Sequence, residues 1–281
     1  MNRNRSFAYK YVRNITGMIG LVGVVFILIA GLFGPMFFEY PEGYNPEILL
    51  SPSASHPLGT DNLGLDILSQ LIWGARTSIY VSFFAVLVAL AIGIPVGLFC
   101  GYSRSSASHI LDGIIDIFLT LPQLPLQIIT AAIVGPSITT VAVIIGIFSW
   151  PSLARVTKNA ALKARNMQYI EAAEGLGYSR GRIMFRHLLV NITGPITVNA
   201  TMVLALAVIS ESSLSFLGLG DPTTWSWGLV LKRSWSNNAV ISSPNPWWWW
   251  ISPSICITIF VISFNMIGTA INDIFSPKGQ D

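Results

Sequence analysis

Long apolar runs separated by polar segments dominate the pattern of this chain. The runs cover residues 18–38, 78–101, 110–134, 138–154, 192–217 and 247–271. Each is close to the roughly 20 residues that a helix needs to cross a bilayer. The pattern therefore predicts an all-α membrane protein with six spans. Pro122 and Pro125 in the third run and Pro151 in the fourth predict bends in those helices.

Composition agrees with this prediction. Hydrophobic residues make up 52% of the 281 residues and charged residues 10%, with a mean hydropathy of +0.62, whereas soluble domains carry about 25% charged residues. Cys100 and Cys256 lie in apolar runs, where a thiol behaves as a small hydrophobic group. His56, His109 and His187 are spread over both predicted sides of the membrane, so no metal site is expected. No nucleic-acid partner is expected for a chain of this class.

The basic residues indicate how the spans are oriented. If both termini, the turn at 102–109 and the segment 155–191 lie in the cytoplasm, 13 of the 16 Lys and Arg residues are on that side. The other side then holds Arg76, Lys232 and Arg233. Because cytoplasmic loops are enriched in Lys and Arg, this distribution predicts a multi-pass cell-membrane protein with both termini inside.

This topology divides the chain into four parts. Residues 1–16 form a cytoplasmic segment, and residues 17–76 hold the first span and an outer loop. Residues 77–275 form a core of five spans that includes the cytoplasmic loop 158–191, and residues 276–281 form a cytoplasmic tail. The tryptophans at 247 to 250 open the sixth span, where they are predicted to form an interfacial belt.

The segment 158–191 is the longest polar stretch of the chain. Its runs 160–164 and 171–176 contain good helix formers and predict two short helices. Gly175 and Gly177 are predicted to end the second helix, because glycine accepts the left-handed backbone of a helix C-terminus. Ser179 is the predicted N-cap of a third helix. The segment carries six basic residues, Lys158, Lys163, Arg165, Arg180, Arg182 and Arg186.

Within this segment a specific spacing appears. Glu171-Ala172-Ala173, followed by Gly177 and, twelve positions later, Leu189, resembles the EAA loop of ABC-importer permeases. In that family the loop forms a coupling helix that docks on the ATP-binding subunit. His187 and Val190 stand where the family usually has isoleucine and proline. The resemblance implies that the ATPase-coupling residues are Glu171, Ala172, Ala173, Gly177, Arg180 and Arg182.

Two outer segments strengthen the resemblance. The stretch His56-Pro57-Leu58-Gly59-Thr60-Asp61-Asn62-Leu63-Gly64 is similar to the C-type subunit of dipeptide, oligopeptide and nickel permeases. So are Phe216-Leu217-Gly218-Leu219-Gly220 and the later Trp227-Gly228. The fold that this resemblance implies is that of a six-span type I ABC-importer permease.

The function implied by the resemblance is transport without covalent chemistry in this chain. The sequence has no G-x-x-x-x-G-K-[ST] motif for nucleotide binding, so ATP and Mg²⁺ are expected on partner subunits. The implied partners are a second, homologous permease, two ATP-binding subunits, an extracytoplasmic solute-binding protein and the lipid membrane. Peptide is the favoured substrate class, with nickel chelates or oligosaccharides as alternatives. A secondary transporter or an intramembrane enzyme is the alternative from a different class.

Three acidic residues lie in or beside the apolar runs. Glu211 is set deep in the fifth run among serines, which indicates either a residue of the translocation pathway or a packing acid that the serines satisfy. Asp112 and Asp116 lie four apart on one face near the cytoplasmic end of the third run. They are predicted to form ion pairs with Arg155 or another nearby base rather than a substrate site.

Overall fold

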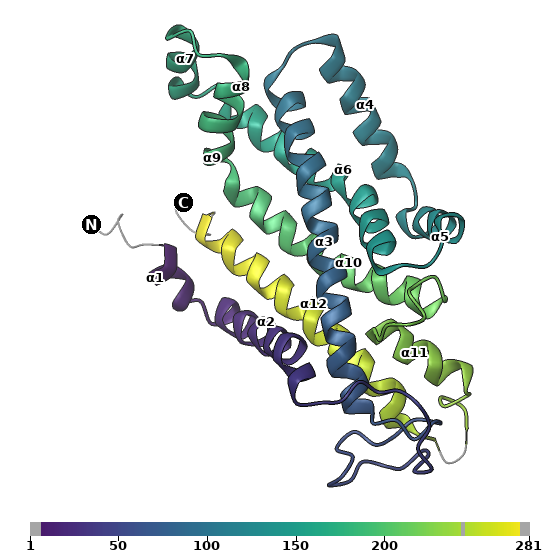
Figure 1. The fold of residues 1–281 in the computed structure, drawn as a ribbon. Helices are drawn as coiled ribbons and strands as arrows, with labels where there is room; N and C mark the ends of the chain where they lie inside the picture. The colour runs from purple at the N-terminus through teal and green to yellow at the C-terminus, as the bar shows by residue number, and fades with distance from the viewer. Residues whose placement is uncertain (1–6, 243–244, 276–281) are drawn as a thin grey trace.

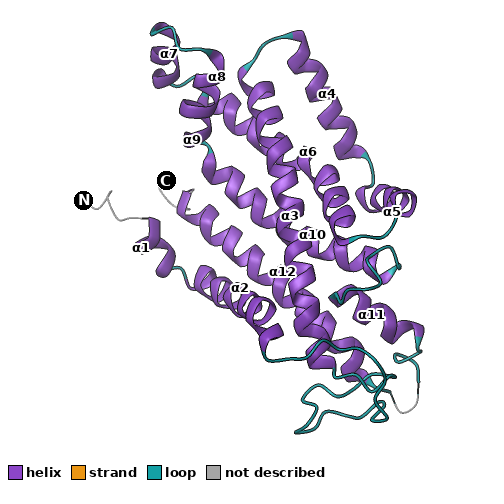
Figure 2. Cartoon of the chain, viewed as in Figure 1, coloured by secondary structure: helices purple, strands orange, loops and turns teal. Residues whose placement is uncertain are grey.

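The chain folds into a bundle of tilted helices, shown in Figures 1 and 2. The computed structural model describes residues 7–242 and 245–275. The predicted tail 276–281 and the first six residues of the predicted segment 1–16 lie outside this range. Within the described residues all regular structure is helical, and one isolated bridge joins Thr60 to Asp66.

Five helices are long and apolar enough to cross a membrane. They are α2 with its short extension (Ile15–Met36), α3 (Ile67–Tyr102), α6 (Ile138–Ala164), α10 (Thr193–Phe216) and α12 (Trp247–Phe275). A sixth candidate is a pair, α4 (Ser106–Thr120) and α5 (Gln123–Val134), whose axes differ by 91°. The predicted all-α fold with six apolar segments is confirmed, and the bend predicted at Pro122 and Pro125 is a complete break.

Two spans are longer than the hydropathy pattern predicts. Helix α3 begins at Ile67 rather than at position 78, because the Asp66 carboxylate accepts a hydrogen bond from the Ser69 amide and caps the helix. Helix α6 continues to Ala164, so the run 160–164 is the end of a span and not a separate short helix. Both extensions carry polar side chains beyond the predicted apolar runs.

Helix α3 packs most extensively against α6. The contact uses small residues at every fourth position of α3, namely Gly93, Gly97 and Gly101. A Cβ atom added at Gly97 would lie 2.5 Å from the Ala154 carbonyl oxygen. Such spacing lets two helix backbones approach closely, which is a common way of packing helices in membranes.

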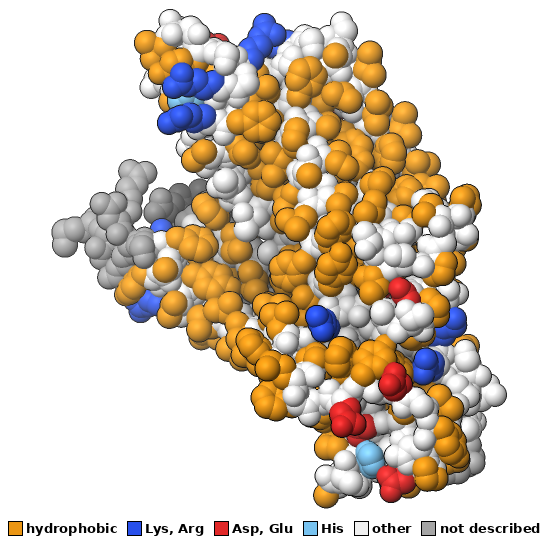
Figure 3. Space-filling view, in the orientation of Figure 1, with side chains coloured by type: hydrophobic (Ala, Val, Ile, Leu, Met, Phe, Trp, Pro, Cys, Tyr) orange, Lys and Arg blue, Asp and Glu red, His pale blue; other side chains and the backbone are white. Residues whose placement is uncertain are grey.

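The two ends of the bundle differ in their side chains, as Figure 3 shows. A broad band of hydrophobic side chains covers the middle of the face in view, and Lys and Arg gather over α7 and α8. We call this end, with the turn 103–105 and the segment 165–191, the basic end. We call the opposite end, with residues 37–66 and 217–242, the capped end. Helix α1 (Phe7–Val12) and the last turn of α12 lie toward the basic end (Figure 1).

The capped end is closed by the loop 37–66, which folds against residues 217–242 and the first turn of α12. Trp248 Nε1 donates to the Thr60 carbonyl at 3.2 Å, and Trp225 Nε1 donates to the Pro41 carbonyl at 2.9 Å. Asp61 is fully buried and accepts hydrogen bonds from the amides of Leu63 and Leu65. Burial raises the pKa of the Asp61 carboxyl. A helix, α11 (Trp227–Ser236), forms within the predicted polar segment between the last two spans.

Candidate functional site at the basic end

A short helix, α7 (Gln168–Gly175), projects from the basic end of the molecule. Its buried side chains are Ile170 and Ala173, three positions apart on one face. The other face, with Glu171 and Ala172, is exposed. At the tip, Leu176 is 71% exposed. The predicted EAA segment is therefore a helix that presents an acidic side chain and an apolar tip to its surroundings.

Gly177 reverses the chain after α7. Its φ angle is +74°, in the left-handed region that only glycine adopts without strain. The Gly177 amide donates to the Glu174 carbonyl, and the Tyr178 amide donates to the Ala173 carbonyl, so the last carbonyls of the helix are satisfied. A Cβ atom at Gly177 would meet nothing within 4 Å. The requirement for glycine here is conformational and not one of space.

A stack of three side chains supports the turn from the other side. The Arg182 guanidinium lies 4.3 Å from the Tyr178 ring centroid, and the Tyr178 and His187 rings are parallel within 16°. Ser179 caps the next helix, as predicted, by accepting from the Arg182 amide. Arg182, predicted as a coupling residue, thus also holds the fold of this segment, and His187 replaces the usual isoleucine as a flat packing surface.

The helix after Ser179 is regular for only one turn. Over Ile183–Leu188 it widens to a π-helix, in which the Leu189 amide donates to the Met184 carbonyl five residues earlier. It returns to α-helix at Leu189–Asn191 and then leads into α10. π-Helical turns are rare and occur often at functional sites. The widened turn lies on the covalent path from α7 to the span that carries Glu211.

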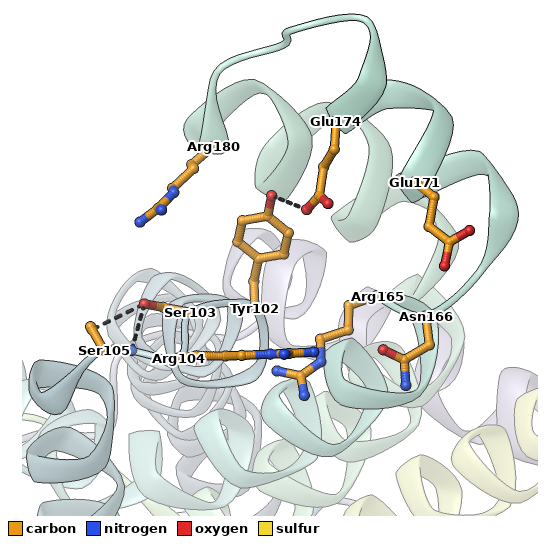
Figure 4. A pocket seen from close by; sticks show the side chains of 9 residues that line it. All are labelled: Tyr102, Ser103, Arg104, Ser105, Arg165, Asn166, Glu171, Glu174 and Arg180. Atoms are coloured by element: carbon orange, nitrogen blue, oxygen red, sulfur yellow. Dashed lines mark hydrogen bonds between the residues drawn. The ribbon is translucent and has the colours of Figure 1, made fainter.

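A polar cavity of about 540 Å³ separates α7 from the turn between α3 and α4. In Figure 4 the Arg104 and Arg165 side chains extend along its floor, while Glu171, Glu174 and Arg180 reach toward it from the segment above. Within the described residues these three arginines make no ion pair. The cavity therefore joins the predicted residues Glu171 and Arg180 in one arrangement, whereas Gly177 and Arg182 lie outside its lining.

One hydrogen bond crosses this cavity. Tyr102 Oη donates to Glu174 Oε1 at 2.7 Å and so ties the end of α3 to α7 (Figure 4). Arg165 donates to the Gly101 carbonyl at 3.3 Å. Sequence reasoning missed Tyr102, Arg104 and Glu174 as members of the site. The sequence did contain one signal for this site: Arg104 lies in a short turn on the same predicted side of the membrane as the basic segment 158–191.

The two aspartates of the third span form the ion pairs predicted for them. Asp116 pairs with Arg155, and Asp112 pairs with Lys158. Both pairs join α4 to α6 near the basic end, which is the structural role predicted for them. The part of the chain that the structure describes contains no cluster of three or more His, Cys, Asp or Glu residues suited to a metal ion.

Glu211 lies far from α7, inside the bundle, and is 2% exposed. Its carboxylate accepts hydrogen bonds from Ser215 at 2.7 Å, Ser78 at 3.0 Å and Ser212 at 3.4 Å. Beside it is a cavity of about 10 Å³, which is room for about one water molecule. In this conformation the serines satisfy the acid, and the pathway role of Glu211 stays a prediction.

Comparison with known proteins agrees with the geometry. The dipeptide transport system permease protein DppC of Alkalihalophilus pseudofirmus is 34% identical over 275 residues, covering 96% of this chain and 89% of the relative. The oligopeptide transport system permease protein OppC of Bacillus subtilis is 32% identical, covering 96% and 88%. The glutathione transport system permease protein GsiD of Pectobacterium atrosepticum is 33% identical, covering 98% and 89%.

The fold also has a counterpart among solved structures. A chain of the MetNI methionine ABC transporter, described as inward facing, superposes with a TM-score of 0.59 at 19% identity and covers 73% of this chain and 96% of its own length. Residues 93–279 match the family described as binding-protein-dependent transport system inner membrane component. The resemblance drawn from the EAA segment and the outer motifs is confirmed. The chain belongs to the family of binding-protein-dependent transport system inner membrane components.

Proposed function

We propose that this chain is the permease subunit of an ATP-driven peptide importer and forms half of its translocation pore. Relatives that span almost the whole chain are named as dipeptide, oligopeptide and glutathione permeases, which supports peptide as the substrate class. A second, homologous permease completes the pore, and an extracytoplasmic solute-binding protein delivers the peptide. Two partner subunits bind ATP and Mg²⁺.

The observation that carries this proposal is the exposed helix α7. Its acidic face, apolar tip and reversed chain at Gly177 make a compact projection suited to a groove on an ATPase subunit. Movement of α7 reaches the spans by two routes. One is the Tyr102–Glu174 hydrogen bond to α3, and the other is the π-helical turn that leads into α10. Both routes connect the docking surface to helices that surround Glu211.

Transport by the purified complex tests the proposed function. A tagged chain is isolated with its partner subunits, reconstituted in proteoliposomes and supplied with its solute-binding protein. We expect ATP-dependent uptake of peptides. ATP-dependent uptake of a nickel chelate or an oligosaccharide, without uptake of peptides, would contradict the substrate class. Uptake that is independent of ATP would contradict the coupling role of α7.

The proposed orientation places the basic end and both termini in the cytoplasm. The distribution of 13 against 3 basic residues supports it. Ser53 and Ser236 at the capped end and Ser179 at the basic end are all exposed. With the two native cysteines replaced, a cysteine at position 53 or 236 is expected to react with an impermeant thiol reagent in intact cells. Labelling of a cysteine at position 179 from outside the cell would show that the basic end faces outward and would contradict the proposed orientation.

A further inference from the structure

A third cavity, of about 400 Å³, opens at the capped end. It is bounded by α3, by the first turn of α6 and by the segment that follows α10. The residues from α3 are spaced at i, i+3, i+4 and i+7 and so share one face of that helix. The complete lining is Trp73, Arg76, Thr77, Tyr80, Ile138, Thr139, Thr224 and Trp225.

Two aromatic walls of this cavity are held in place by the loop 37–66. Trp73 Nε1 donates to the carbonyls of Phe38 and Glu39 at 3.1 and 3.2 Å. Trp225 is 4% exposed, donates to a carbonyl of the same loop, and carries the Arg233 guanidinium 4.1 Å from its ring centroid. Because the walls are already fixed, a ligand would not have to order them on binding.

The polar groups of the cavity are a cation and hydroxyls. Arg76 is exposed, and within the described residues no carboxylate forms an ion pair with it. Its guanidinium lies 6.0 Å from the Trp73 ring centroid, which leaves its N–H donors available. The Thr224 hydroxyl is buried and, in the same part of the chain, has no hydrogen-bond partner. A buried hydroxyl without a partner is costly, so this group favours a ligand or water that completes it.

The cavity adjoins the small space beside Glu211. The two share Thr77, Ile138 and Thr224 in their linings. Glu211 and Asp221 line the small space and do not line the larger cavity. Serine hydroxyls donate to Glu211, and the Thr223 hydroxyl donates to one oxygen of Asp221. A ligand in the cavity would therefore meet Arg76 as the accessible charged group, directly in front of the bundle interior.

We propose that this cavity binds the C-terminal carboxylate of a peptide as it enters the permease. A planar guanidinium suits a carboxylate because it can donate two parallel hydrogen bonds. The Thr224 hydroxyl would add a third donor, and the rings of Trp73, Tyr80 and Trp225 would contact the adjoining peptide group or side chain. Every linear peptide carries this carboxylate, so the site would accept peptides of different sequence. The inference rests on the proposed function for its substrate class.

The test compares peptides with and without the carboxylate. The probe is a mixture of di- to pentapeptides, each present as the free acid and as the C-terminal amide, offered to the reconstituted complex with saturating solute-binding protein. Affinity of the isolated binding protein for both forms is measured separately and used to correct uptake. We expect Arg76→Gln to lower the maximal uptake of free acids about tenfold, with little change for amides. Arg76→Lys keeps the positive charge but loses the paired donors. Its maximal uptake of free acids is expected to lie between that of the wild type and that of Arg76→Gln.

Lys232→Gln provides a matched control. It removes a positive charge from the same end, and Lys232 does not line the cavity. Its uptake of both forms should equal that of the wild type. If Arg76→Gln instead raises the concentration of binding protein needed for half-maximal uptake, equally for acids and amides, Arg76 contacts the binding protein and the proposal is wrong. Unchanged uptake of both forms also overturns it. Failure of the wild type to import any peptide would be a failure of the proposed function itself.

Discussion

The two ends of the bundle are built on different principles. At the capped end the indoles of Trp73, Trp225, Trp227 and Trp248 each donate to a backbone carbonyl that is distant in sequence. At the basic end α7 buries only two side chains, and one side-chain hydrogen bond ties it to α3. Hydrogen bonds between segments distant in sequence therefore hold the capped end together. The basic end owes its shape mainly to local backbone geometry.

This difference indicates which end of the bundle can move during function. Segments with few buried contacts open at low free energy, and regions that move during function are drawn from them. Glu171 on α7 and Leu176 directly after it are exposed and form the surface proposed to dock on an ATPase subunit. In the loop 37–66, backbone carbonyls accept hydrogen bonds from Trp73 and Trp225. These bonds fix two walls of the cavity of about 400 Å³ that Arg76 lines. The following changes separate these two roles.

The largest effect is expected from Gly177→Val at the basic end. A side chain in the left-handed region costs about 1–2 kcal/mol, so α7 would lose its tip geometry although nothing blocks the added atoms. We expect the stimulation of ATPase activity by loaded binding protein to fall about tenfold or more. Thermal unfolding of the spans should remain unchanged. ATPase assays with loaded binding protein and co-purification of the ATP-binding subunits measure the loss of coupling, and thermal unfolding of the same preparations measures the stability of the spans.

Gly181→Val is the matched control for this change. Gly181 is also exposed, a Cβ atom added to it would meet nothing within 4 Å, and its φ angle is not positive. Its stimulation should stay close to that of the wild type. Glu171→Lys, which reverses the charge on the exposed face of α7, should act in the same direction as Gly177→Val. Full stimulation in both the Gly177 and the Glu171 variant would mean that this segment is only a connector.

A smaller, several-fold effect is expected from Glu211→Gln, at a residue that lies inside the bundle next to the capped end. The change keeps the shape and removes the charge that the serine hydroxyls now face. If Glu211 belongs to the pathway, uptake per assembled complex falls several-fold and assembly is intact. A lower unfolding temperature with normal uptake per assembled complex would assign Glu211 to packing alone. Uptake assays and thermal unfolding of the same preparations distinguish these results.

At the capped end, Trp248→Phe is expected to affect stability rather than coupling. It leaves the Thr60 carbonyl without its indole donor, and Thr60 is fully buried. Loss of one partner of a buried hydrogen bond costs about 1–3 kcal/mol. The unfolding temperature should fall by several degrees, while ATPase stimulation per folded complex is retained. Trp247→Phe, at a residue that is 51% exposed, is the control and should change neither.

The smallest effect concerns the pH dependence of the capped end. The His56 ring lies 2.9 Å from an Asp66 oxygen and 3.1 Å from a Glu47 oxygen. The hydrogen bond to Asp66, more than that to Glu47, raises the pKa of His56 above its ordinary value of 6.5. The stabilisation is therefore fully present below about pH 6.5 and is lost as the pH rises through the higher value of the folded state.

His56→Gln should remove this dependence. Limited proteolysis of the loop 37–66 between about pH 5 and pH 8 measures it. In the wild type, cleavage should increase modestly toward the upper end of that range, whereas the variant should be cleaved at one rate throughout. Equal slopes in both proteins would show that the two carboxylates do not act through His56.

The sequence by itself determined the features that depend on neighbouring residues. Apolar runs of the right length predicted the spans, because a helix in lipid satisfies its own backbone hydrogen bonds. Gly177 and Ser179 predicted the end of one helix and the start of the next, since both effects act within a few residues. The EAA spacing and the outer motifs predicted the family for the same reason: they can be read along the chain.

Only the tertiary structure decided how distant segments meet. Proline at 122 and 125 predicted a bend, but the 91° angle between α4 and α5 could be read only from the folded chain. The predicted interfacial belt is wrong for Trp248 and Trp249, which are 8% and 1% exposed. Trp248 is held inside by its hydrogen bond to the Thr60 carbonyl of the loop 37–66. Arg76 and Thr224 are nearly 150 positions apart, and no pattern along the chain places them in one cavity. Contacts of this kind arise only when the whole bundle closes.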